Sequence, residues 1–273
     1  LPGAPPGVER QTMPNPMRGV VLVRCPHPLT APPGQAVASI VESLESYGLV
    51  PMLSGSEAGA LGAILVRPPD PVHVLQRLRN RRYPFALVDS RPPVLRDVPA
   101  AWSDPAAGVR DLAAHLRALG HGRIALITCA TAPAGVGFAP HLVRRVAEPS
   151  PEHGRRAAGE LLERPGAPTA LICADDRLAT GALRAAADRG LRVPRDLSVA
   201  ALDESGLGAL ARPELTVARA PWPALGRTAA ALLAQLLDGI DPIPHSVEVP
   251  PDLSLAASTG PVIAEPLHPA GVA

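Results

Sequence analysis

The chain has 273 residues, 47% of them hydrophobic and 19% charged, a composition typical of a globular protein with about two domains. Its apolar runs are too short to span a bilayer and no secretion signal opens it, so we expect a cytoplasmic protein without a membrane partner. All 26 basic residues are arginine and face 25 acidic residues, so the net charge of +1 gives no general attraction to nucleic acid.

After a proline-rich tail over residues 1–17, strands and helices alternate along the chain. The first half predicts, in order, strand 19–24, helix 35–47, strands 49–54 and 62–66, helix 71–82 and strand 85–88. The second half predicts helix 105–119 capped by Asp104, strand 124–128, helix 152–163, strand 169–173, helix 176–189, strand 197–202, helix 223–237 and the short strands 246–249 and 253–257. Such alternation predicts an α/β fold of two similar lobes, each a parallel sheet flanked by helices, with ligands at the carboxyl ends of the strands.

Five segments resemble motifs of the effector-binding region of the LacI/GalR family of bacterial transcription regulators. They are LGHGRIA at 119–125, TALICADDRLATGAL at 169–183, GLRVPRDLSVAALDES at 190–205, PELTVARAP at 213–221 and VPPDLSLAAST at 249–259. Together with the strand–helix pattern, they extend the resemblance over most of residues 20–261.

The resemblance implies a type I periplasmic-binding-protein-like fold with three crossovers between the lobes, near 102–104, 217–219 and 245–247. It divides the chain into an N-terminal lobe (18–103 plus 219–245), a C-terminal lobe (104–218 plus 246–262), and tails at 1–17 and 263–273. Residues 1–17 lack the family's helix-turn-helix, so operator DNA would be bound only through a domain that is not in this chain.

The resemblance also implies a small-molecule effector between the lobes, such as a sugar, polyol or nucleoside-like compound. Asp89, Asp175 and Asp203 each follow a predicted strand, where a carboxylate can accept hydrogen bonds from ligand hydroxyls. Asp175 can instead cap the following helix, and the other two can cap a turn. Trp102, at a crossover, offers a stacking face or packs the hinge, and His27 follows the first strand.

The sequence departs from the family at several cleft positions. The family's cleft arginine falls on Ala134, its aromatic loop on 27–30, and the arginine of its last motif on Ala256. A cleft without these groups would bind an ordinary pyranose poorly, which favours a neutral polyol, an amine-bearing compound or no effector. The connections after Ser54 and around 146–151 are also shortened.

The sequence therefore predicts the effector-binding and dimerisation domain of a LacI-type regulator. The alternatives are a solute-binding module of a transport system and a regulator domain with a degenerate effector site. We expect no enzyme, because nucleophile-elbow, zinc-protease and P-loop motifs are missing, and no metal or cofactor, because the three cysteines form no Cys-x-x-Cys pair. A homodimer along 35–47 and 71–82 is expected, with a monomer as the alternative.

Overall fold

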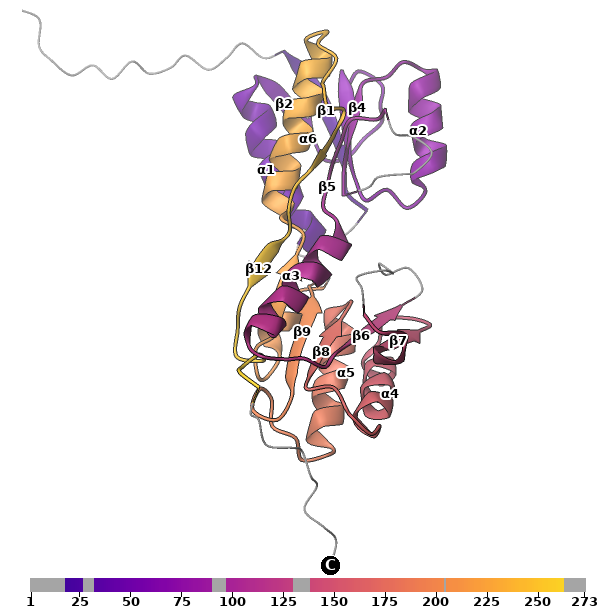
Figure 1. Ribbon diagram of the computed structural model, residues 1–273. Helices are drawn as coiled ribbons and strands as arrows, with labels where there is room; N and C mark the ends of the chain where they lie inside the picture. The colour runs from indigo at the N-terminus through magenta and orange to yellow at the C-terminus, as the bar shows by residue number, and fades with distance from the viewer. Residues whose placement is uncertain (1–17, 27–31, 90–96, 130–137, 204, 263–273) are drawn as a thin grey trace, which may run out of the picture.

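The computed structural model describes residues 18–26, 32–89, 97–129, 138–203 and 205–262, which form two lobes, each built on one sheet (Figure 1). The N-terminal lobe contains β1 (Gly19–Arg24), β2 (Leu49–Met52), β3 (Gly62–Val66), β4 (Phe85–Val88), β5 (Ala100–Trp102), β11 (Ser246–Glu248), α1 (Pro32–Ser46), α2 (Pro71–Asn80) and α6 (Trp222–Leu237). The C-terminal lobe contains β6 (Ile124–Cys129), β7 (Val143–Val146), β8 (Ala170–Cys173), β9 (Ser198–Leu202), β10 (Thr216–Arg219), β12 (Asp252–Ser254), α3 (Pro105–Ala118), α4 (Pro151–Leu162), α5 (Asp176–Ala187) and the 3-10 turns η1 (Pro140–Leu142) and η2 (Leu207–Leu210).

Both sheets have the same strand arrangement, which confirms the predicted fold of two similar α/β lobes. The orders are β11-β5-β4-β3-β1-β2 and β12-β10-β9-β8-β6-β7. Every strand pair is parallel except β10 with β12 at the edge of the second sheet. The register of the central pairs, such as Leu22 with Ala63 and Leu126 with Ile172, brings the carboxyl ends of neighbouring strands to one edge of each sheet.

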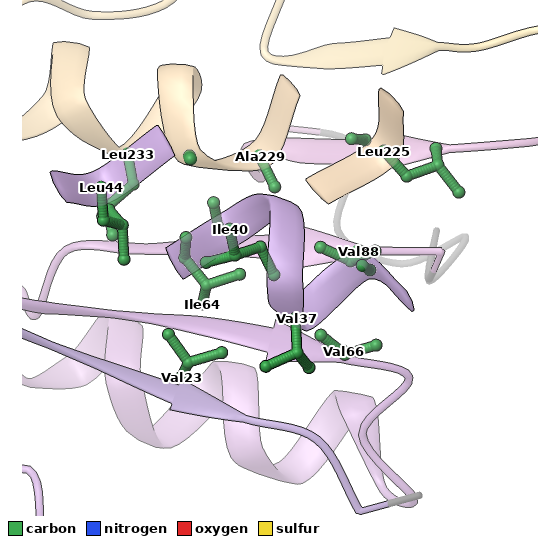
Figure 2. Packing of buried hydrophobic residues seen from close by; sticks show 14 of the residues in the cluster. Val23, Val37, Ile40, Leu44, Ile64, Val66, Val88, Leu225, Ala229 and Leu233 are labelled. Atoms are coloured by element: carbon green, nitrogen blue, oxygen red, sulfur yellow. The ribbon is translucent and has the colours of Figure 1, made fainter. Parts of the chain in front are cut away.

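Alternate side chains of the N-terminal sheet enter two separate cores. On one face, the sheet packs against α1 and α6; Figure 2 labels Val23, Ile64, Val66 and Val88 of the strands with Val37, Ile40, Leu44, Leu225, Ala229 and Leu233 of the helices. On the other face, Leu22, Leu65 and Leu87 pack against Leu75 and Leu78 of α2. Because both faces are covered, the strands are continuous apolar runs, which is why they are recognisable in the sequence.

The C-terminal sheet is covered in the same way. Ile127, Leu171 and Val199 contact the α4–α5 layer, while Leu126, Ile172 and Ala200 contact α3 on the opposite face. Asp104 begins α3 by accepting a hydrogen bond from the Ala106 amide at 2.9 Å, with proline at the first helical position, as the sequence predicts.

Three features differ from the sequence-based expectation. Strand β7 was not predicted, because two of its four residues are Arg144 and Arg145 and it lies at a sheet edge, where the apolar pattern is weak. Strands β5 and β10 lie where the sequence predicts only crossovers between the lobes. The third crossover also lies later than predicted: Ser246–Glu248 pairs with β5 in the N-terminal lobe, so the chain crosses between β11 and β12 rather than at 245–247.

Among the residues described, no helix has the length and apolar character needed to cross a membrane.

Candidate functional site

A small cavity lies between the lobes beside the crossovers. Its volume is about 20 Å³, and its walls are Arg67, Asp89, Ser103, Asp104, Pro105, Gly108, Leu202, Ala218, Arg219, Ala220 and Pro251. Strands β4, β9 and β10 all direct their carboxyl ends to this place, which is where ligands bind in open α/β sheets. We call this space the interlobe cavity.

The N-terminal lobe contributes an arginine–aspartate pair to the cavity. Arg67 follows β3, Asp89 follows β4, and the Arg67 Nε donates to Asp89 Oδ2 at 2.5 Å, with only 9% of the Asp89 side chain exposed. The Arg67 guanidinium also lies over the ring of Trp222, 4.9 Å from its centroid, in a cation–π contact.

The backbone at this pair is strained. Arg67 and Asp89 have φ values of 40° and 50°, a left-handed conformation that few non-glycine residues adopt. Neighbouring strands hold them there: the Arg67 amide donates to Val88 O at 3.0 Å, and the Asp89 amide donates to Ala101 O at 2.7 Å. Such strain persists only where the surrounding structure fixes it, and it is frequent at functional sites.

The C-terminal lobe contributes a second, looser pair. Asp203 follows β9 and accepts a hydrogen bond from the Gly206 amide at 2.9 Å. The Nε of Arg219, the last residue of β10, lies 3.7 Å from Asp203 Oδ2, which is an ion pair but not a hydrogen bond. Among the described residues, this buried Nε has no hydrogen-bond acceptor, and neither does the Nε1 of Trp222.

The buried carboxylate of Asp176 holds the segment that follows Asp203 through hydrogen bonds. Asp176, the first residue of α5, is fully buried and accepts hydrogen bonds from Ser205 Oγ at 2.6 Å and from the Leu207 amide at 2.8 Å. Burial, and then the neighbouring Asp203, raise the pKa of Asp176 above its ordinary value. Asp176 thus fixes the segment that follows Asp203 and connects it to η2.

The remaining predicted site residues lie elsewhere. Asp175 caps α5: its carboxylate accepts from the Arg177 amide at 2.8 Å and from the Arg177 guanidinium, which is the capping alternative considered above. Trp102 is half-buried at the end of β5, does not line the interlobe cavity, and accepts a hydrogen bond from the Val249 amide at 2.8 Å through its carbonyl. His27 lies outside the described residues, as does Ala134. Ligand roles for Asp175, Trp102 and His27 stay predictions.

The thiols occupy two kinds of environment. Cys25 follows β1 and Cys129 ends β6, and both are half-buried, whereas Cys173 is fully buried in β8. Burial raises the pKa of the Cys173 thiol far above its usual range, so this thiol stays protonated and unreactive. No group of three or more His, Cys, Asp or Glu side chains is placed to hold a metal ion within the described part of the chain.

Sequence reasoning missed Arg67, Arg219, Trp222 and Asp176. The family position of the cleft arginine, Ala134, lies outside the described residues, while two arginines at other positions line the interlobe cavity. Arg67 follows a predicted strand, as Asp89 and Asp203 do, so the same strand-end rule applied to basic residues would have selected it. Arg219 ends β10, where the sequence predicts only a crossover, so no strand-end signal marks it.

Comparison with known proteins gives a consistent assignment. Residues 113–259 match the family model of the periplasmic binding protein-like domain. The chain is 34% identical over 224 residues to an uncharacterized HTH-type transcriptional regulator in the aml 5′ region of Streptomyces limosus, covering 75% of this chain and 61% of that protein. It is 36% identical over 210 residues to the HTH-type transcriptional regulator reg1 of Streptomyces lividans, covering 67% of this chain and 58% of that protein. The chain thus spans less than two thirds of the length of these curated relatives.

Solved structures show the same fold. A regulatory protein of the LacI family from Chloroflexus aggregans superimposes with a TM-score of 0.73 at 22% identity, covering 88% of this chain and 98% of that one. The complex of the transcriptional regulator CelR with cellobiose superimposes with a TM-score of 0.69 at 23% identity, covering 90% of this chain and 86% of that one.

Proposed function

The chain belongs to the periplasmic binding protein-like domain family, in the form found in LacI-type regulators, and we propose that it is the effector-binding domain of a transcription regulator. The observation that carries this proposal is the interlobe cavity, where charged side chains from both lobes meet beside all three crossovers. A ligand bound there contacts both lobes at once and therefore stabilises one relative orientation of the lobes over another.

The proposed mechanism is a shift in lobe closure. An effector changes the equilibrium between open and closed forms only to the extent that it binds the two forms unequally. We propose that this shift is transmitted through a homodimer to a DNA-binding domain outside the present sequence, in the cytoplasm and without catalysis. The regulators named above, which are HTH-type proteins longer than this chain, support this arrangement.

A ligand screen by thermal unfolding tests the binding role. A ligand at 100 times its dissociation constant stabilises the native state by about 2.7 kcal/mol, which raises the melting temperature by roughly 5–10 °C for a chain of this size. The panel holds sugars, disaccharides including cellobiose, polyols, sugar acids, amino sugars and nucleosides. No stabilisation by any of them would refute effector binding and favour a degenerate site.

A second experiment tests the regulatory role. The complete protein that contains this chain is titrated with its operator DNA in the presence and absence of the ligand found in the screen. We expect the affinity for the operator to change with ligand. Identical affinities would contradict regulation and leave the solute-binding alternative.

A further inference from the structure

We propose that the chain has a second ligand site, in a pocket at the outer edge of the N-terminal lobe, and that this site takes a small zwitterion of the amino-acid type with an apolar side chain. The inference goes beyond the proposed function, because it concerns a different site and does not depend on an effector in the interlobe cavity.

The pocket lies at the opposite edge of the N-terminal sheet from the interlobe cavity. Phe85, which lines the pocket, begins β4, whereas Asp89, which lines the interlobe cavity, follows the end of the same strand. The volume of the pocket is about 310 Å³. Pockets for small molecules range from about 300 to 1,000 Å³, so this one suits a ligand of amino-acid size. We call this space the outer pocket, and its lining includes Arg79, Arg82, Phe85, Asp97, Leu236 and Asp241.

The outer pocket carries equal numbers of basic and acidic side chains. Arg79 and Arg82 come from the end of α2, whereas Asp97 and Asp241 come from the segments that lead into β5 and β11. An anion would meet both carboxylates and a cation would meet both guanidinium groups, so neither matches the whole set. A zwitterion does, because its carboxylate pairs with guanidinium and its ammonium group pairs with carboxylate.

Three of these four charged groups have no partner among the described residues. Asp241 forms an ion pair with His245, whose Nε2 lies 3.3 Å from the Asp241 Oδ1. The side chains of Arg79, Arg82 and Asp97 form no hydrogen bond or ion pair within the described part of the chain. Their charges are therefore available to a ligand, in contrast to those of the two arginines in the interlobe cavity, which are paired with aspartates.

Arg82 is held in a backbone conformation that arginine rarely adopts. Its φ is 51°, and the chain turns here directly after α2: the Arg82 amide donates to Arg79 O at 2.9 Å, and the Tyr83 amide donates to Leu78 O at 3.1 Å. Many helices end in this way, and the left-handed position is usually glycine, because other residues are strained there. Strain of this kind is frequent at ligand sites, and the unpaired guanidinium of Arg82 gives it a reason.

The outer pocket also has an apolar surface. Phe85 and Val98 are buried in the lobe and reach the pocket beside Leu236, Pro84 and Pro99. An apolar ligand side chain that covers this surface removes it from water, which favours binding. A sugar offers hydroxyls instead, so an amino acid with an aliphatic or aromatic side chain fits the lining better.

Isothermal titration of this chain with free and blocked amino acids tests the inference. Leucine and phenylalanine are titrated beside their N-acetyl forms, which lack the ammonium charge, and their amides, which lack the carboxylate charge. We expect at least one free amino acid to bind, and each of its blocked forms to bind at least about tenfold more weakly, since each loses a charge-assisted hydrogen bond.

Two results would overturn the inference. A blocked form that binds as tightly as the free amino acid would exclude a zwitterion, and no binding of either amino acid up to millimolar concentration would exclude the site. Neither result bears on the proposed function, which the ligand screen and the operator titration test separately.

Matched variants locate the ligand. Arg79→Gln and Asp97→Asn should each weaken binding of the free amino acid at least about tenfold. Arg117→Gln and Asp111→Asn are the controls, and their affinity should be unchanged. Both control residues are exposed on α3 in the other lobe, and neither forms a hydrogen bond or ion pair within the described part of the chain.

Arg82→Gly separates a binding role of Arg82 from a structural one. Glycine relieves the left-handed backbone, so this variant should melt at or above the wild-type temperature. It should nevertheless bind the amino acid at least about tenfold more weakly. Wild-type affinity in Arg82→Gly and Arg79→Gln would refute the site.

Discussion

Gly181, in the middle of α5, lies directly against the backbone of α4. A Cβ at this position would lie 2.0 Å from the carbonyl oxygen of Pro151 and 2.6 Å from the amide nitrogen of Arg155. Both atoms belong to the backbone of α4, so no side-chain rotation relieves the overlap. Gly181→Ala therefore requires the two helices to move apart by about 1 Å before normal contact distances are restored, which weakens packing along their shared face.

The expected cost follows from two opposing contributions. Overpacking a close-packed core typically costs about 1–3 kcal/mol and sometimes more, and rigid backbone contacts place this case at or above the upper end. Alanine returns about 1 kcal/mol because it is a better helix former than glycine. The net loss of unfolding free energy is thus about 2–3 kcal/mol, or roughly 4–12 °C in melting temperature for a protein of this size.

Thermal and urea unfolding of Gly181→Ala, compared with Gly159→Ala, measures this effect. Gly159 is also helical and buried, but the three atoms nearest to a Cβ there all belong to the Arg189 guanidinium, at the end of a flexible side chain and 2.9 Å away at its closest. Gly159→Ala should therefore be within about 1 kcal/mol of wild type or more stable. If Gly181→Ala melts at or above the wild-type temperature, or if the two variants behave alike, the close backbone contact between α4 and α5 is not what requires glycine.

Three further predictions follow from buried titratable groups. Burial lowers the pKa of His121, so the stability that neutral His121 contributes is present above about pH 6.5 and is lost as the pH falls through the folded-state pKa. His121→Gln should therefore flatten the acid side of a plot of urea midpoint against pH. An unchanged plot would contradict this linkage. Burial raises the pKa of Asp176, so the stability that protonated Asp176 contributes is present below about pH 3.9 and is lost as the pH rises through the folded-state pKa. Asp176→Asn should therefore gain stability relative to wild type between pH 4.5 and 7.5. Parallel plots of urea midpoint against pH for the two proteins would show that no such linkage exists. A thiol reagent added to the native protein should label Cys25 and Cys129, and it should label Cys173 only after the protein unfolds. Labelling of Cys173 in the native protein, detected by mass spectrometry, would show that its burial is transient.

Local patterns in the sequence determined most of the secondary structure. Strands β3 and β4 have the predicted bounds, because strands buried on both faces are uninterrupted apolar runs between polar segments. Helix α3 begins where Asp104 and Pro105 predict, because capping depends on neighbours two or three residues away. The same local reasoning placed Asp89 and Asp203 at strand ends, and the tertiary structure brings Asp89 to the interlobe cavity and Asp203 beside Arg219.

Only the tertiary structure decided the partners of those aspartates. Arg67 is 22 positions from Asp89, and Arg219 is 16 positions from Asp203, so no helical or strand periodicity relates them. Their meeting depends on how β3 lies beside β4, how β9 lies beside β10, and where the chain crosses between lobes, including the late crossover after β11. Strand order and lobe placement are set by the burial of whole apolar faces, a property that residue spacing does not encode, and this is why the two arginines of the cavity became visible only in the folded chain.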